Sequence, residues 1–122
     1  MPRQISVSEL AHLLASGTPV RLVDVRAPWE HTRTHLPDST LIPLPELDER
    51  WSELLPAAGE SPPGAAAEPR ADGPLIVTYC HHGVRSLGAA ALLEAKGVGP
   101  VASLAGGIDA WSRLIDPAVP QY

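Results

Sequence analysis

Short apolar runs alternate along the chain with segments whose apolar residues recur at helical spacing. The runs are rich in Val, Ile and Leu and predict buried strands at 19–25, 40–44, 75–79 and 100–104. The periodic segments predict helices at 45–55 and 86–96, one that begins after Ser6 and ends at Gly17, and a short one after Gly106 and Gly107. Strands that alternate with helices are typical of an α/β fold, so we expect a parallel sheet with helices on both faces.

The expected helices carry recognisable ends and apolar faces. Ser6 and Glu9 have the spacing of a capping box, in which each side chain accepts a hydrogen bond from the other residue's backbone N–H. The residues expected to face the core are Leu10, Leu13 and Leu14 in the first helix, Leu47, Trp51 and Leu54 or Leu55 in the second, Leu87, Ala90, Ala91 and Leu92 in the third, and Trp111 and Leu114 in the last.

One long segment, 56–74, contains no Val, Ile or Leu and consists largely of Ala, Gly, Pro and Glu. This composition cannot bury a strand or an amphipathic helix, so we expect an exposed, flexible loop. Too little chain lies on either side of the loop for two domains. The sequence therefore predicts a single domain over 1–122 with this loop as an insert.

Cys80 stands where the apolar run 75–79 ends, and a loop leads from it into the predicted helix at 86–96. Open parallel sheets place their ligand sites at such strand-to-helix crevices. Backbone N–H groups that curl around one point form an anion-binding nest, and Gly83 can supply the positive φ that such a curl needs. The nest, the helix dipole and Arg85 are all expected to favour the thiolate form of Cys80.

Four segments carry a family resemblance. They are Leu-Val-Asp-Val-Arg at 22–26 with Glu30 after it, His-Leu-Pro-Asp-Ser at 35–39, the loop from Cys80 to Arg85, and Leu-Ala-Gly-Gly-Ile-Asp-Ala-Trp at 104–111. In this order they resemble the motifs of the rhodanese (thiosulfate sulfurtransferase) family. Asp38 stands where that family usually has Gly, and the long segment before the Cys strand is an insert.

The resemblance implies a rhodanese-like fold and a two-step sulfur transfer. The Cys80 thiolate would take the outer sulfur of a donor such as thiosulfate, become a persulfide, and pass the sulfur to cyanide or a thiol. A protein could also serve as sulfur donor or acceptor. No cofactor is implied. Cys80 is the expected catalytic residue, Asp24 and Arg26 are expected to support the loop, and the expected substrate-binding residues are His81, His82, Gly83, Val84 and Arg85.

Two other functions stay open at this point. Phosphatases and arsenate reductases that resemble this fold have five residues between Cys and Arg, whereas four residues, His81 to Val84, separate Cys80 from Arg85 here. A shorter loop makes a smaller cradle, suited to one sulfur atom rather than a tetrahedral oxyanion. A non-enzymatic sulfur carrier or interaction module is the second alternative, although an inactive module would be expected to have lost the cysteine.

We interpret the remaining polar clusters as structural. His81 and His82 are adjacent, and adjacent residues rarely converge on one ion, while His31 and His35 lack the glutamate of a zinc-protease motif, so we expect no metal site. Asp24, Arg26 and Glu30 are read as a network that pins the exit of the first strand. Arg85 has two open roles: it binds the anionic donor, which charge steering favours, or it braces the loop by pairing with Asp24 or Glu30.

Charge and composition exclude several partners. The net charge is −5, which argues against non-specific binding to nucleic acid or to an anionic membrane. One cysteine allows no internal disulfide, and the first residues do not form a signal peptide. No apolar run is long enough to span a bilayer. We therefore expect a cytoplasmic protein.

Overall fold

The computed structural model describes residues 3–54, 75–98 and 100–119. The strands are β1 (Arg3–Ile5), β2 (Val20–Asp24), β3 (Thr40–Leu41), β4 (Leu75–Tyr79) and β5 (Val101–Leu104). The helices are α1 (Val7–Ala15), α2 (Pro28–Arg33), α3 (Leu44–Arg50), the 3-10 turn η1 (Trp51–Leu54), α4 (Val84–Ala95) and α5 (Gly107–Leu114). The predicted loop at 56–74 lies outside the described residues.

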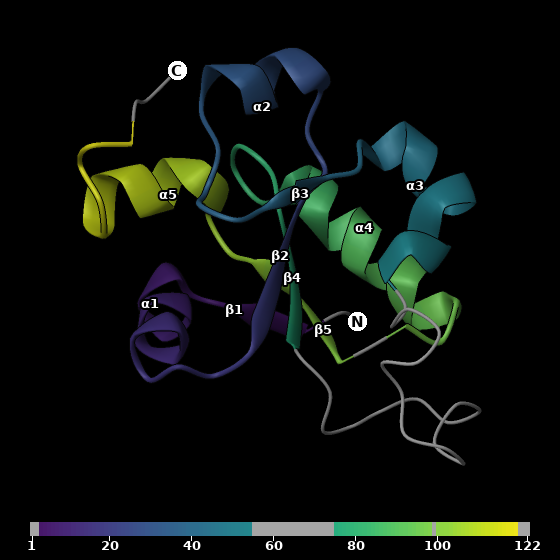
Figure 1. Cartoon of the computed structure of the whole chain (residues 1–122), viewed down its shortest axis with the longest axis horizontal. Helices are drawn as coiled ribbons and strands as arrows, with labels where there is room; N and C mark the ends of the chain where they lie inside the picture. The colour runs from purple at the N-terminus through teal and green to yellow at the C-terminus, as the bar shows by residue number, and fades with distance from the viewer. Residues whose placement is uncertain (1–2, 55–74, 99, 120–122) are drawn as a thin grey trace.

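The strands form one parallel sheet in the order β1-β5-β4-β2-β3, as the α/β pattern predicted. Asp24 at the end of β2 pairs in register with Tyr79 at the end of β4, and Thr78 pairs with Ser103 of β5. Because the strands are parallel, their carboxyl ends meet at one edge of the sheet, where α2 also lies (Figure 1). Cys80 follows β4 at this edge.

Helices cover both faces of the sheet, and the core is accordingly divided into two clusters. Val77 and Tyr79 of β4 belong to the cluster that includes α1 and α5, whereas Ile76 and Cys80 belong to the one that includes α3 and α4. Figure 1 shows α1 and α5 on one side of the strands and α3 and α4 on the other. The alternation along β4 directs the Cys80 side chain toward α4.

The predicted helices form, with differences at their ends and faces. The capping box of Ser6 and Glu9 is present, and α1 ends before Gly17. On the α1 face, the prediction is confirmed for Leu10, which is buried, and for Leu13, which packs against the core, but it was wrong for Leu14, which is 42% exposed. The 45–55 prediction covers a shorter α3 that continues into η1.

Helix α4 differs most from its prediction. It begins at Val84 instead of 86, because the chain turns directly from Gly83 into helical conformation. Its buried residues are Ser86, Ala89, Ala90 and Leu93, so Ala90 is confirmed, Ala91 is exposed, and Leu87 and Leu92 are only partly buried. Small side chains on this face let α4 pack closely on β4 and β5.

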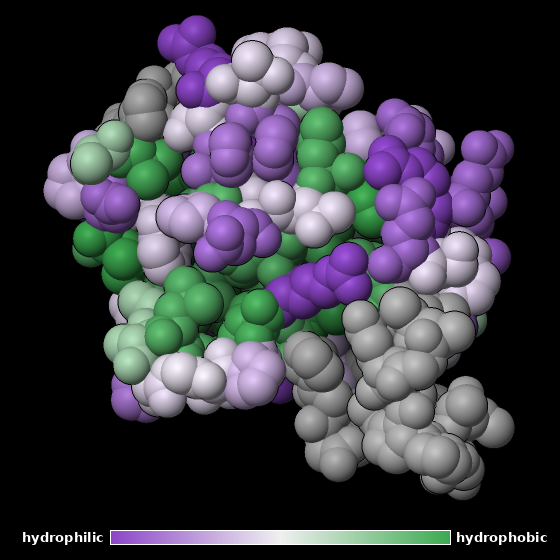
Figure 2. All heavy atoms as spheres, viewed as in Figure 1, coloured by the Kyte–Doolittle hydropathy of each residue, from purple (hydrophilic) through white to green (hydrophobic). Residues whose placement is uncertain are grey.

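The surface shows where hydrophobic residues remain exposed. Figure 2 shows hydrophobic residues over α1 and a mainly hydrophilic surface over α3. Among the tryptophans, Trp111 is buried, Trp51 is partly buried and Trp29 is 63% exposed. Within the described part of the chain, we find no helix whose length and apolar character would let it span a membrane.

Candidate active site

The sulfur of Cys80 lies beneath the start of α4, surrounded by hydrogen-bond donors. Cys80 is 1% exposed. The backbone N–H groups of Gly83 and Ser86 donate to Sγ at 3.0 and 3.4 Å, and the Ser86 hydroxyl oxygen lies 3.6 Å away. Gly83 has φ +102°, a conformation that a side chain would strain. The loop therefore turns its donors toward one sulfur atom, an arrangement that stabilises negative charge there.

A chain of buried hydroxyl groups continues behind the sulfur. The Ser86 and Ser103 side-chain oxygens are 2.8 Å apart, and the Thr78 hydroxyl donates to the Ser86 carbonyl at 2.8 Å. All three residues are fully buried. The sequence analysis did not single out Ser103, although a polar residue inside the apolar run 101–104 was the available signal.

Arg85 lies in the first turn of α4, and its side chain forms a bidentate ion pair with Glu30 of α2. Its Nη1 and Nη2 donate to Oε1 and Oε2 at 2.6 and 3.0 Å. The Glu30 side chain is 6% exposed and also accepts from the Ala27 backbone N–H. Of the two roles left open by the sequence, this geometry favours bracing, because the guanidinium joins the end of the loop to α2.

Asp24 and Arg26 form a buried ion pair at the exit of β2. Arg26 Nε and Nη2 donate to the two Asp24 oxygens at 2.8 and 2.6 Å, and His31 Nδ1 lies 2.8 Å from Asp24 Oδ2. Arg26 also donates to the Thr34 carbonyl and lies 5.5 Å from the centre of the Tyr79 ring. This network holds the chain after β2 against the residue that precedes Cys80.

Tyr79 connects the sheet to the turn at 36–39. Its hydroxyl accepts from the Leu36 backbone N–H at 3.1 Å and donates to the Ser39 side chain at 2.9 Å. Burial, with a smaller contribution from the Asp24 charge, raises the pKa of Tyr79 to about 12. Asp38 in this turn has φ +61°, a conformation that Asp tolerates and that suits Gly, the residue that the family resemblance implies at this position.

His81 and His82 lie on the loop beside the first turn of α5. Their rings are stacked with centroids 4.0 Å apart. His82 is largely exposed and His81 is partly buried, and Val84 at the start of α4 is 80% exposed. Burial and, secondarily, the neighbouring His82 lower the pKa of His81. The Ile108 and Asp109 backbone N–H groups donate to the Cys80 and His81 carbonyls at 2.9 and 3.1 Å, which fastens α5 to the loop.

Comparison with known proteins identifies the family to which this chain belongs. Residues 6–114 match the family model described as the rhodanese-like domain. The chain belongs to the rhodanese-like family. A protein named sulfurtransferase from Allochromatium vinosum is 34% identical over 93% of this chain and 91% of its own length. The human single-domain sulfurtransferase TSTD1 superposes with a TM-score of 0.69 at 30% identity, over 93% of this chain and 97% of that one.

Some rhodanese-like relatives are much longer than this chain. The adenylyltransferase and sulfurtransferase MOCS3 of Arabidopsis thaliana is 31% identical over 98% of the chain, which spans only 26% of that protein. The rhodanese-like fold and membership of a sulfurtransferase family thus confirm the expectation drawn from the four motifs.

Proposed function

We propose that this protein is a sulfurtransferase that carries a sulfane sulfur on Cys80. The thiolate attacks the outer sulfur of thiosulfate or a similar donor, the sulfur–sulfur bond of the donor breaks, and sulfite leaves with the electron pair. A nucleophile such as cyanide or a thiol then takes the outer sulfur and regenerates the thiolate. The observation that carries the proposal is the position of Sγ beneath the Gly83 and Ser86 N–H groups.

The loop residues have distinct proposed roles. The N–H groups at Gly83 and Ser86 stabilise the thiolate and the anionic sulfur of the persulfide. His81, His82 and Val84 surround the approach to the loop and contact the donor or acceptor. Arg85 braces the loop through Glu30, and its charge adds to the local positive potential. Asp24 and Arg26 support the loop from β2.

The wider assignments are also proposals. We propose a single rhodanese-like domain over 1–122 that works in the cytoplasm, because a lone cysteine and a chemistry based on its thiolate suit a reducing compartment. The names of the MOCS3 relatives join sulfur transfer to adenylyl transfer, which supports a protein as one candidate sulfur acceptor.

Intact mass spectrometry tests the central step. Incubation with thiosulfate should add the mass of one sulfur atom, and cyanide should remove it with release of thiocyanate. Cys80→Ser should abolish both changes. A serine variant that still forms thiocyanate contradicts the proposal. A protein that loads with sulfur once but does not turn over with cyanide or small thiols would instead be a sulfur carrier.

A further inference from the structure

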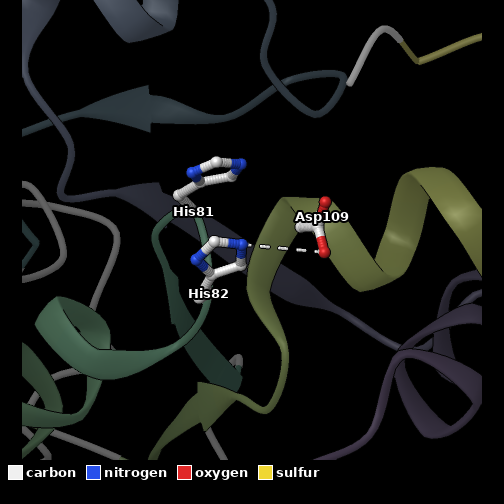
Figure 3. A group of neighbouring side chains, drawn as sticks. All are labelled: His81, His82 and Asp109. Atoms are coloured by element: carbon white, nitrogen blue, oxygen red, sulfur yellow. Dashed lines mark ion pairs between the residues drawn. The ribbon is translucent and has the colours of Figure 1, made fainter. Parts of the chain in front are cut away.

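Three side chains with metal-binding atoms converge at the rim of the Cys80 loop. They are His81 and His82 of the loop and Asp109 of α5, and one ligand atom from each lies within 4.8 Å of the others. Figure 3 shows the two imidazole rings one above the other, with the Asp109 carboxylate beside them on the first turn of the helix. The dashed line joins His82 Nε2 to Asp109 Oδ2, which are 3.8 Å apart.

The backbone holds these side chains together independently of any ion. Two hydrogen bonds join the start of α5 to the Cys80 and His81 carbonyl oxygens. Gly107 allows the close approach, since a Cβ atom there would lie 2.3 Å from the Cys80 carbonyl oxygen and 2.5 Å from that of His81. The ligand set is therefore assembled by the fold, and binding an ion does not need to order two separate segments.

The distances suit a small ion after modest side-chain movement. Zinc binds histidine nitrogen and carboxylate oxygen at about 2.0 to 2.2 Å, so tetrahedral ligands lie about 3.3 Å from one another. The present ligand atoms lie up to 4.8 Å apart and the two imidazole rings are stacked, so binding an ion requires the exposed His82 ring to rotate away from His81. Two nitrogen donors favour zinc and its transition-metal neighbours over magnesium or calcium, which prefer oxygen.

The charges near the cluster also permit a cation. Arg113 donates to Asp109 Oδ2 at 2.8 Å and would compete with an ion. The Arg113 side chain is 56% exposed and that of Asp109 is 17% exposed, so an ion must displace a partly buried ion pair whose arginine can turn toward solvent.

We propose that His81, His82 and Asp109 bind a divalent transition-metal ion of the zinc type at the rim of the loop, with a fourth position open to water or another ligand. The metal site shares His81 and His82 with the proposed approach to the loop but does not include the reacting sulfur, because the Cys80 side chain packs toward α4 and its sulfur accepts hydrogen bonds from Gly83 and Ser86. The sequence analysis expected no metal site, because adjacent histidines rarely converge on one ion, and it could not foresee the third ligand, Asp109, which is distant along the chain.

Calorimetric titration with zinc chloride tests the site in the full chain carrying Cys80→Ser, which removes the thiol as a competing ligand. The expected result is one bound zinc per chain and a rise in Tm on adding zinc. His82→Ala and Asp109→Asn, added separately to this parent, should each raise the zinc Kd by about tenfold or more. His12→Ala, which removes an exposed histidine of α1, is the matched control and should leave the Kd unchanged.

Three results would contradict the proposed metal site. The site is wrong if the parent shows no saturable binding, if either ligand variant binds zinc as tightly as the parent, or if His12→Ala weakens binding as much as His82→Ala does. Circular dichroism without metal checks that each variant is folded. The titration involves no sulfur transfer, so its outcome is independent of the test of the proposed function.

Discussion

At the scale of single residues, the ion pair between Arg85 and Glu30 predicts a loss of stability when Arg85 is replaced. Arg85→Ala leaves the Glu30 carboxylate, 6% exposed, without its bidentate partner. A charge-assisted contact of this kind contributes about 1.5 to 3 kcal/mol, and the partial exposure of Arg85 places the expected loss of stability near the lower value. Chemical denaturation should show this loss, and turnover should fall with it.

Two further variants separate bracing from donor binding by Arg85. Arg85→Lys should recover little stability, because lysine lacks the planar fork that binds both oxygens. Arg50→Ala is the control, since Arg50 pairs with Glu46 and Glu53 on the exposed face of α3 and η1, and its loss should leave stability nearly unchanged. If Arg85→Ala keeps full stability but raises the thiosulfate KM, the residue binds the donor instead.

The buried hydroxyl of Ser86 should affect the reactivity of Cys80. Its oxygen lies 3.6 Å from Sγ and is held by Ser103 at 2.8 Å. The Cys80 thiol donates to this oxygen, and the hydroxyl can donate in return when the sulfur carries negative charge. Ser86→Ala removes that hydroxyl, and the loss of a hydrogen bond to a charged group, about 1.5 kcal/mol, corresponds to about tenfold in rate. The rate of alkylation by iodoacetamide at neutral pH should therefore fall by up to about tenfold, with a smaller fall for Ser103→Ala.

Ser112→Ala provides the control for that measurement. Ser112 is also buried on a helix, but its hydroxyl donates to the Val119 carbonyl rather than toward the loop. Its removal should leave the alkylation rate unchanged. Equal rates for Ser86→Ala and wild type would show that the backbone N–H groups alone sustain the thiolate.

At the scale of elements, the junction between the Cys80 loop and α5 depends on Gly107. Its φ is +61°, and an added Cβ would collide with the Cys80 and His81 carbonyl oxygens. Gly107→Ala should therefore destabilise the fold by about 2 kcal/mol or more, from backbone strain together with the displaced contact. Thermal unfolding measures the loss, and thiocyanate formation should fall because the loop moves with α5.

Gly88→Ala is the matched control on a neighbouring helix. Gly88 lies within α4, and a Cβ there would meet nothing within 4 Å. Alanine should stabilise α4 by about 0.5 to 1 kcal/mol, because glycine loses more conformational entropy in a helix. A Gly107→Ala variant as stable as Gly88→Ala would show that the close approach of α5 to the loop does not constrain the fold.

The sequence predicted most elements because each has a local signal. The apolar run of β4, the Ser6 cap and the Gly106–Gly107 turn all produced the expected structure. Strand β1 was missed because it has three residues, of which Arg3 and Gln4 are exposed. Its hydrogen bonds to β5, and not its own composition, make it a strand.

The candidate site likewise has parts that a local sequence pattern predicts and parts that depend on distant contacts. The Cys80 loop was predicted from a local pattern, the strand, the turn and the helix start. The choice of Glu30 rather than Asp24 as partner of Arg85, and the approach of Ser103 and Asp109 to the loop, depend on how distant segments pack. No local pattern encodes such distances, so a single sequence leaves them open.

At the scale of the whole molecule, Tyr79 should make stability depend on alkaline pH. Its pKa is raised from 10.0 to about 12 by burial, so the folded state holds the hydroxyl proton more tightly than the unfolded state does. The resulting stability is fully present below pH 10 and is lost as the pH rises toward 12. Each pKa unit is worth about 1.4 kcal/mol, so the loss should reach about 2 to 3 kcal/mol.

Denaturation at a series of alkaline pH values measures this loss. Tyr122→Phe removes the second tyrosine, so the tyrosinate absorbance of that variant reports Tyr79 alone. Tyr79→Phe should be less stable at neutral pH, since it lacks the bonds to Leu36 and Ser39, but its stability should fall less steeply above pH 10. An equally steep fall would exclude Tyr79 as the responsible group.

The pairing of β1 with β5 has a consequence for the order in which the chain folds. Arg3 lies opposite Ala102 and Ile5 opposite Leu104, so residues about a hundred positions apart must meet to complete this edge of the sheet. During synthesis, β1 leaves the ribosome first but must wait for β5. Contacts this distant slow folding, since the entropy of closing the chain is lost before they form. We therefore expect β1 to join the sheet after translation has passed β5, and a nascent chain stalled before Val101 to leave this strand unprotected from hydrogen exchange.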